Sequence, residues 1–366
     1  MCLVGGVRVP LAYYHCKCCG KGQKPGERLW GLVGRQLTLG AEQIVSLAGA
    51  LVSFQEASQR VLRTMAGLKL SESTVQRTAE EAGKRAAAQL AEGRPWGQSE
   101  RWQWQRDAQG RRCAYVSVDA TGVRRQGPDG RRVEGRMAYV GLVYNANSEH
   151  DSTRPLPGQV RYLAGFYDLT TLGRRLHEQA LEVGWAEAEQ QIAISDGGSG
   201  LEEFFRTHFP KAECILDFWH AKEHLVELGQ ALYPSDESQR QQWTDQACHR
   251  LKHEGGRAVR RWLESLELDE ASAELKEEHR RQVQYFRNHE HKMDYPRYLR
   301  NGWQIGSGPV ESACKTVVGN RLKGGGMRWG EPGSHAICHL RALYLSEPCC
   351  WESFWDPTPP DAYLQN

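Results

Sequence analysis

Two aspartates stand at the ends of apolar segments rich in β-branched residues. Asp119 closes the segment Tyr-Val-Ser-Val, and Asp196 closes Ile-Ala-Ile-Ser. Small residues follow both of them, which leaves room for ions and a substrate near the backbone. A third carboxylate, Glu311, lies in Gly-Ser-Gly-Pro-Val-Glu at the start of a segment with helical periodicity, one residue off its apolar stripe.

Three carboxylates from separate elements can converge on one oxygen-rich site. Such sites suit Mg²⁺ or Mn²⁺. Two ions about 3.5–4 Å apart activate an attacking oxygen and stabilise a leaving one in phosphoryl transfer. Taken singly, an aspartate before glycine is explained as well by a turn. Taken together, Asp119, Asp196 and Glu311 are predicted to hold two Mg²⁺ or Mn²⁺ ions.

A second polar cluster follows the next apolar segment. Asp217 and His220 stand three residues apart, and His224 follows four residues after His220. A histidine pair at i and i+4 can bind zinc, but no third ligand is evident in the sequence, so we do not expect zinc there. Asp217 also suits the N-cap of a helix.

The segments between these residues predict a mixed sheet. Apolar, strand-like runs alternate with amphipathic helices in the order three strands, helix, strand, helix, strand. The first three strands are close enough for hairpins, whereas the later ones need crossovers. This order predicts an α/β fold of the ribonuclease H-like type. The strands are expected at 113–119, 137–144, 161–169, 191–194 and 212–217, and the helices at 172–185 and 201–209.

Three short helices are predicted before the sheet. The pattern is helical from Ala41 to Gly83, Gly67 interrupts it, and Ser71 is expected to cap the third helix, which should end near Gly83. This arrangement is typical of a helix-turn-helix, whose last helix enters the major groove of DNA. The side chains expected to contact DNA are Thr74, Gln76 and Arg77. The polar, tryptophan-rich segment 89–109 is predicted to be a linker.

Basic residues surround a glycine-rich loop after the Glu311 helix. Glycines let a backbone approach a phosphate, and cations neutralise it, although a solvated turn has the same composition. We expect DNA contacts here because the loop follows Glu311 closely. The residues concerned are Lys315, Arg321, Lys323 and Arg328. Trp262 and Trp303 are candidates to stack on an unpaired base, although Trp262 fits better in a helical core.

Charge and cysteine content restrict the class of protein. The chain of 366 residues has a net charge of only +2, so local charge must decide the partner. Residues 1–36 carry six cations against one anion, and residues 301–330 carry four against one. Eleven cysteines, an odd number, are not typical of a small disulfide scaffold. With no signal peptide and no apolar stretch long enough to span a membrane, the sequence predicts a cytoplasmic protein.

The sequence resembles the ISKra-type bacterial insertion-sequence transposases, which are related to the Mutator-like group. The resemblance extends from Tyr13 to about Leu345 and rests on five strings: Asp119-Ala-Thr-Gly, Ser-Asp196-Gly-Gly, Asp217-Phe-Trp-His220-Ala-Lys-Glu-His-Leu, Gly-Ser-Gly-Pro-Val-Glu311-Ser and Asn320-Arg-Leu-Lys-Gly-Gly-Gly-Met-Arg-Trp.

The resemblance implies a DNA transposase of the DDE type. It matches Asp119, Asp196 and Glu311 to the catalytic triad, and Asp217 and His220 to a Cys/Asp-x-x-His signature, in which His220 contacts phosphate or orients the site. It also implies action on double-stranded DNA, at transposon ends and target, by a homo-oligomer associated with the bacterial nucleoid. The enzyme would cut at the ends and transfer the 3′-hydroxyls to target DNA.

The resemblance also implies an order of domains along the chain. They are a partial zinc-ribbon-like segment at 1–40, a helix-turn-helix region at 41–95, the first part of the catalytic core at 96–222, a helical insertion at 223–302, the last part of the core with Glu311 at 303–347, and an irregular tail at 348–366.

The N-terminal segment departs from the family. Related chains have an upstream cysteine pair that completes a zinc ribbon, whereas Cys16 and Cys19 form a single C-x-x-C here. Structural zinc needs about four ligands, so less than stoichiometric zinc is expected. Two alternatives to a transposase therefore stay open: a structure-selective nuclease on the same fold, and a non-catalytic DNA-binding regulator or truncated transposase remnant.

Overall fold

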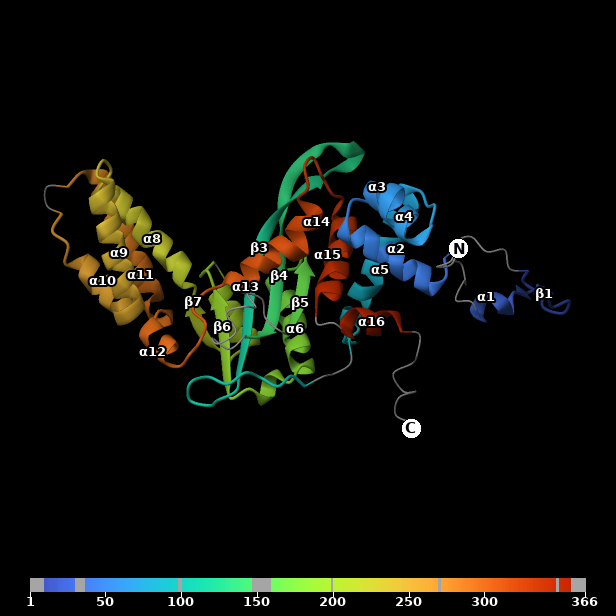
Figure 1. Ribbon diagram of the computed structural model, residues 1–366, viewed down its shortest axis with the longest axis horizontal. Helices are drawn as coiled ribbons and strands as arrows, with labels where there is room; N and C mark the ends of the chain where they lie inside the picture. The colour runs from blue at the N-terminus through green and yellow to red at the C-terminus, as the bar shows by residue number, and fades with distance from the viewer. Residues whose placement is uncertain are drawn as a thin grey trace.

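Helices surround one mixed sheet in the computed structural model, which describes residues 10–29, 37–97, 101–146, 159–198, 200–268, 271–346 and 349–356. The five strands are ordered β5-β4-β3-β6-β7 (Figure 1). β3 pairs antiparallel with β4 and parallel with β6, β4 pairs antiparallel with β5, and β6 pairs parallel with β7. The strand bounds are Cys113–Gln126, Arg132–Asn145, Gln159–Gly165, Gln190–Ser195 and Glu213–Leu216 for β3 to β7.

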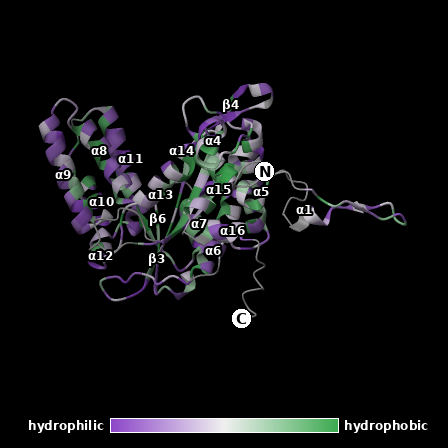
Figure 2. Ribbon diagram, turned by 45° about the vertical axis from the view of Figure 1, so that its right-hand side comes forward, coloured by the Kyte–Doolittle hydropathy of each residue, from purple (hydrophilic) through white to green (hydrophobic). Residues whose placement is uncertain are grey.

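All five predicted strands are confirmed, but β3 and β4 are longer than expected. The predicted parts are buried in the sheet, whereas the additional residues form a hairpin that extends beyond it (Figure 1). The end of the hairpin is hydrophilic (Figure 2). A hairpin tip is predicted by the Gly/Pro/Asp turn that Arg124, Arg125, Arg131, Arg132 and Arg136 surround, and it is confirmed; only the strand bounds, which were set by the apolar runs, are too short. The hairpin continues β3 directly beyond Asp119.

Helices cover the sheet and its β5 edge. α6 (Leu169–Glu182) packs on β4 and β5, and α7 (Leu201–His208) packs on α6. α15 (Glu331–Leu345) lies along β5, where His335 Nδ1 accepts a hydrogen bond from Phe166 N at 3.0 Å. Ser346 Oγ, just past this helix, accepts one from Tyr162 N at 3.0 Å. The edge strand is therefore closed by side-chain acceptors instead of another strand.

The N-terminal helices pack against α15. They are α2 (Leu39–Leu51), α3 (Phe54–Glu56), the π-helical η1 (Ala57–Val61), α4 (Leu62–Ala66) and α5 (Glu72–Ala91). Ser71 caps α5 as predicted, accepting a hydrogen bond from Thr74 N at 3.2 Å. The predicted end near Gly83 is wrong. A Cβ at Gly83 would lie 2.1 Å from the Ala336 carbonyl oxygen, so this glycine allows close packing of two helices and does not end one.

Two buried arginines join these helices to the C-terminal ones. Arg321 Nε donates to Gly49 O at 2.9 Å, and Arg341 donates to Ala50 O and Val317 O, both at 2.7 Å. Gly49 and Ala50 belong to the last turn of α2, where free carbonyls attract cations. Arg321 is only 2% exposed, and burial lowers its pKa to about 10. The prediction that Arg321 contacts DNA is therefore wrong.

The predicted linker at 89–109 is also wrong. Trp96, Trp102 and Trp104 are buried in the main core. Trp96 Nε1 donates to Ala86 O at 2.9 Å and Trp104 Nε1 to Gly184 O at 3.0 Å. Each buried indole thus has its hydrogen-bond partner. The polar residues between the tryptophans led to the prediction of a linker, although the tryptophans themselves belong to the core.

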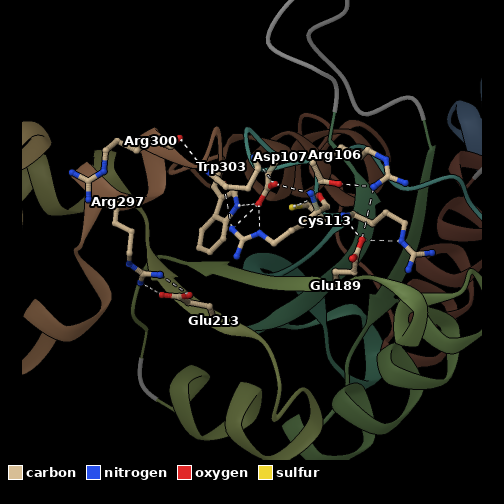
Figure 3. Close-up of polar contacts among 12 residues, drawn as sticks. Arg106, Asp107, Cys113, Glu189, Glu213, Arg297, Arg300 and Trp303 are labelled. Carbon is tan, nitrogen blue, oxygen red and sulfur yellow. Dashed lines mark hydrogen bonds and ion pairs between the residues drawn. The ribbon is translucent and has the colours of Figure 1, made fainter.

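A separate group of helices stands beside β7, between β7 and the Glu311 helix in the sequence (Figure 1). Arg297 of α12 pairs with Glu213 of β7, and Trp303 Nε1 donates to Asp107 at 3.1 Å (Figure 3). These helices are α8 (Phe218–Leu232), α9 (Glu237–Glu254), α10 (Gly256–Glu264), α11 (Ala273–His289) and α12 (Tyr295–Arg300). The indole of Trp262 stacks on Trp243 at 5.2 Å. Trp303 is buried, so it is not free to stack on a base.

The helix predicted from the periodicity of Val310 to Val318 is confirmed, but its middle is π-helical. α13 (Gly308–Ala313) passes into the π-helical η5 (Cys314–Gly319) and then α14 (Asn320–Leu322). The tail predicted as irregular contains α16 (Cys349–Trp355), whose Trp351 and Trp355 are buried. Within the described ranges, no helix has the length and apolar character needed to cross a membrane.

Candidate active site

The parallel strands bring three aspartates to one edge of the sheet. Ser117 of β3 pairs with Ile194 of β6, so Asp119 and Asp196, each two residues further on, reach the same level. Ser195 pairs with Leu216 of β7, and Asp217 N donates to Ser195 O at 2.8 Å. Parallel strands end at a common edge, which is why residues nearly a hundred positions apart in sequence become neighbours.

The α13–η5 segment adds the fourth carboxylate. Both α13 and η5 contact β3. Cys314 Sγ donates to Asp119 Oδ2 at 3.5 Å, and Ser307 Oγ, at the N-cap of α13, lies 3.1 Å from Glu311 Oε1. These contacts fix Glu311 opposite the strand ends.

One cavity of about 220 Å³ contains all five residues predicted to be catalytic. Among the residues that the structure describes, no lysine or arginine contributes a side chain to its wall. The lining residues are Val118, Asp119, Asp196, Asp217, Trp219, His220, Glu223, Ser307, Val310 and Glu311. The structure thus brings the predicted set together in a strongly acidic hollow.

The charges in this cavity act on one another. Burial raises the pKa of Asp119, and the charges of Asp196 and Glu311 raise it further. Local backbone amides orient the strand-end carboxylates: Ala120 N donates to Asp119 Oδ1 at 2.6 Å, and Gly198 N to Asp196 Oδ1 at 2.8 Å. The remaining acceptor positions are suited to an ion that prefers oxygen ligands.

Ser307 connects the two halves of the site and was missed by the sequence analysis. It is 3% exposed, and its hydroxyl donates to Asp217 Oδ2 at 2.7 Å while lying beside Glu311. Asp217 also caps α8, accepting from Trp219 N at 3.0 Å, so the N-cap interpretation of this residue is confirmed. The only sequence signal for Ser307 is its position in Gly-Ser-Gly before a helix.

The helices after β7 add aromatic and imidazole groups. His220 Nδ1 lies 3.3 Å from Glu223 Oε2. His224 stacks on Tyr285 of α11 at 3.5 Å, and its Nδ1 contacts Gln282 Oε1 at 2.8 Å. The buried Tyr285 hydroxyl has no hydrogen-bond partner among the described residues. Burial and then the charges of Asp196, Asp217 and Glu223 raise its pKa, which shows that this hydroxyl lies near the acidic cavity.

The other predicted DNA contacts lie apart from the cavity. At the start of α5, Arg77 and Gln76 are exposed, Gln76 Nε2 bonds Glu80 Oε1 at 2.9 Å, and Thr74 is half-buried beside Ser71. Lys315, Lys323 and Arg328 are exposed. Lys323 Nζ donates to Thr121 Oγ1, two residues past Asp119.

The glycine-rich loop is attached to the β3–β4 hairpin. Trp329 N donates to Arg124 O at 3.1 Å, and Gln126 N to Trp329 O at 2.9 Å. A groove of about 760 Å³ lies there, lined by Arg124, Arg132, Val133, Glu134, Gly135 and Arg328. Across the described residues its three arginines have no ion-pair partner, whereas Arg125 and Arg136 both pair with Glu331. We call these three arginines the arginine groove.

The cysteine pair lies in a small hairpin at the N-terminus. β1 (Tyr14–His15) pairs with β2 (Gly22–Gln23), and α1 (Pro25–Leu29) follows. Cys16 and Cys19 are exposed free thiols, and hydrogen bonds from the backbone of Cys19 and Cys18 lower the pKa of Cys16. No group of three or more histidine, cysteine or acidic side chains within the described ranges, the carboxylates of the acidic cavity included, is arranged as a ready set of metal ligands. Low zinc content stays a prediction.

Comparison with known proteins adds no family to this description: no protein-family model matches the chain, and no curated protein is significantly similar to it. What the residues do must therefore be argued from the site itself.

Proposed function

We propose that this protein is a metal-dependent DNA transposase of the DDE type that cuts insertion-sequence ends and transfers the 3′-hydroxyls to target DNA. The observation that supports it most is the single acidic cavity in which Asp119, Asp196 and Glu311 meet Asp217 and His220. Five residues chosen from separate parts of the sequence line one hollow of about 220 Å³, and Glu311 reaches it from a helix outside the sheet.

The donor set of the cavity fits divalent cations. Carboxylate and hydroxyl oxygens line it, no lysine or arginine among the described residues does, and burial together with the charges of Asp196 and Glu311 raises the pKa of Asp119. Asp119, Asp196 and Glu311 would hold two Mg²⁺ or Mn²⁺ ions, which supply an activated attacking oxygen and a stabilised leaving oxygen in phosphoryl transfer.

The other groups keep these ligands in place. Ser307 positions Glu311 relative to Asp217, and Asp217 fixes the first turn of α8. That turn carries His220 to the cavity wall, where an N–H of the imidazole can donate to a phosphate oxygen. The Cys314 thiol contacts Asp119 from the opposite side and restricts its rotation.

The sheet supports assignment to the ribonuclease H-like group. Three antiparallel strands followed by two parallel ones in the order β5-β4-β3-β6-β7 agree with that fold, with one carboxylate in the first strand, just past its pairing with the fourth, and another directly after the fourth strand. The helices α8 to α12 then form an insertion before the helix that carries Glu311.

Double-stranded DNA is the substrate that the surroundings of the cavity favour. Of the arginine groove, Arg124 lies on β3 five positions past Asp119, about 16 Å along the strand, and Lys323 contacts Thr121 of the same strand. Cations at that distance can neutralise phosphates several nucleotides from the cut. The exposed start of α5 is the candidate reader of the end sequence. We further propose a homo-oligomer that pairs two ends.

A cleavage assay on DNA from the ends of the element tests this proposal. Asp119→Asn, Asp196→Asn and Glu311→Gln should each abolish cutting in Mg²⁺ or Mn²⁺, because the amide removes the charge that holds the cations, while binding measured in Ca²⁺ persists. Glu237→Gln, at an exposed position on α9 outside the cavity, is the matched control and should cut like wild type. Normal cutting by folded Asp119→Asn contradicts the proposal. Binding without any cutting by wild type favours the regulator alternative.

A further inference from the structure

We propose that Trp219 is a stacking platform for one unpaired nucleobase beside the scissile phosphate, an inference that rests on the proposed function. Trp219 lies in the first turn of α8 and lines the acidic cavity together with Asp119 and Glu311. It therefore presents a large planar surface where a nucleotide must lie if its phosphate reaches the carboxylates.

The exposure of this indole distinguishes it from the other tryptophans. Trp219 is 57% exposed, whereas the remaining tryptophans in the described ranges are buried or, for Trp262, half-buried. A tryptophan side chain carries 150–250 Å² of surface that folding ordinarily removes from water. Because Trp219 retains more than half of its exposure at the rim of a polar cavity, its surface is available to a ligand.

The indole is also held in a defined place. Its backbone N–H donates to Asp217 Oδ1 at 3.0 Å, and the ring of Phe218 meets it edge to face at 5.7 Å. Gly306 approaches the pyrrole side so closely that a Cβ there would lie 3.2 Å from Cδ1 and 3.3 Å from Nε1. These contacts hold the edge of the ring, and Lys222 lies over it, while more than half of the side chain stays exposed to a ligand. A side chain held in this way loses little further freedom on binding.

The chemistry of the surroundings points to a nucleotide base. Lys222 Nζ lies 5.3 Å from the centre of the indole ring, so a cation is at hand for the phosphate of a stacked nucleotide. Bases in a duplex already cover each other's faces, so an indole can stack only on one that has left the helix. The site thus favours DNA with an unpaired nucleotide next to the cut.

Fluorescent oligonucleotides test this inference directly. The probe is a duplex of the element's end sequence with 2-aminopurine unpaired next to the cut, compared with the same strand fully paired. The Asp119→Asn protein in Ca²⁺ prevents cutting during the measurement. We expect strong quenching of the unpaired probe, and about tenfold weaker binding with less quenching when Trp219→Ala is added. Trp219→Phe should keep most of both, because phenylalanine retains a ring.

Two comparisons make the result specific. Binding of the fully paired probe should change less than twofold in Trp219→Ala, and Leu181→Ala, at an exposed apolar position on α6, should leave both probes unaffected. Equal binding and quenching by wild type and Trp219→Ala on the unpaired probe overturn the inference, as does equal loss on both probes, which would make Trp219 a general contact.

The outcome separates this inference from the proposed function. If wild type never cuts DNA but quenching depends on Trp219, the transposase proposal fails and a base-binding site stands. If cutting requires Asp119 but neither binding nor quenching depends on Trp219, the transposase proposal stands and the stacking platform is wrong.

Discussion

Side chains of like charge lie close together at two places in this molecule, and the groups around them differ. Arg321 and Arg341 are buried near each other, and the charge of Arg341 contributes to the lowered pKa of Arg321. Both guanidinium groups nevertheless donate to backbone carbonyls of α2 and η5. In the acidic cavity, Asp119, Asp196 and Glu311 gather without any lysine or arginine among the lining residues.

This difference indicates separate roles for the arginine pair and for the carboxylates of the acidic cavity. Buried guanidinium groups that donate to backbone carbonyls of another element join the two elements. Carboxylates that repel one another without a protein cation cost stability in the free protein, a cost that a bound metal ion can offset. We therefore interpret the arginine pair as structural and the acidic cavity as a place that an ion completes.

The largest expected effect is on the free energy of unfolding, through Arg321 and Arg341. We call these two buried residues, which join α2 to the C-terminal helices, the arginine joint. Arg341→Leu removes three donors and leaves the carbonyls of Thr316, Val317 and Ala50 without them, which should lower the free energy of unfolding by about 3–5 kcal/mol. Asp119→Asn should leave it unchanged or slightly higher in the absence of metal, because one repelling charge disappears. Urea unfolding of both variants in EDTA measures this contrast. Equal destabilisation by the two substitutions would remove the distinction between the regions.

A second prediction concerns the stability of the protein in acid. It depends on His339, which lies on α15 together with Arg341 of the arginine joint. Burial lowers the pKa of His339 to about 3, with the charges of His335 and Arg175 adding to the effect, and the Tyr167 hydroxyl contacts its Nε2. Above about pH 6.5 the imidazole is neutral in both the folded and unfolded states. As the pH falls below that value, the unfolded chain binds the proton first, so stability decreases until the pH reaches about 3.

The size of this acid effect can be measured by unfolding at pH 7 and pH 4.5. Two pH units below the ordinary histidine pKa correspond to about 2–3 kcal/mol for a fully buried ring. His339→Gln should lose that part of the pH dependence, whereas His249→Gln, at an exposed position on α9, should keep it. If His339→Gln loses as much stability between pH 7 and pH 4.5 as the wild type does, then the wild-type ring takes up its proton in the folded protein.

The smallest expected effect is on DNA affinity at the arginine groove. The double substitution Arg124→Gln and Arg132→Gln should weaken binding of any duplex, by about 1 kcal/mol at moderate salt, and reduce the slope of log K against log salt by about 2. Lys211→Gln, placed before β7 at the opposite edge of the sheet, should leave the slope unchanged. A titration of labelled duplex at several salt concentrations measures the slope for the wild type, the double variant and Lys211→Gln. An unaltered slope in the double variant would show that this groove does not hold phosphates.

The strand-end carboxylates were predictable because local patterns determine them. Apolar runs define β6 and the buried first half of β3, and each run is followed by an aspartate and then by glycine or alanine, although β3 itself continues to Gln126. The N-cap role of Asp217 follows from the same kind of local signal. Features that depend on residues within a few positions of each other are therefore readable from one sequence.

The errors arose where distant packing determines the outcome. A glycine is typical of a helix end, but Gly83 lies inside α5, where α15 packs closely against it. Arg321 follows Glu311 in a basic loop segment, but its side chain turns toward α2. The exposed Trp219 and the buried Trp303 are indistinguishable in sequence, since only the fold decides which indole faces solvent. Ser307 acquires its role through Asp217, ninety residues away.

Direct measurement of ion binding tests the interpretation of the acidic cavity most closely. Titration of the metal-free protein with Mn²⁺, followed by electron paramagnetic resonance, should show at least one bound ion per chain. Its affinity should fall at least tenfold in Asp119→Asn and stay unchanged in Glu237→Gln. Mn²⁺ binding of equal strength in wild type and Asp119→Asn, with both proteins folded, would contradict the claim that these carboxylates are gathered to hold a metal.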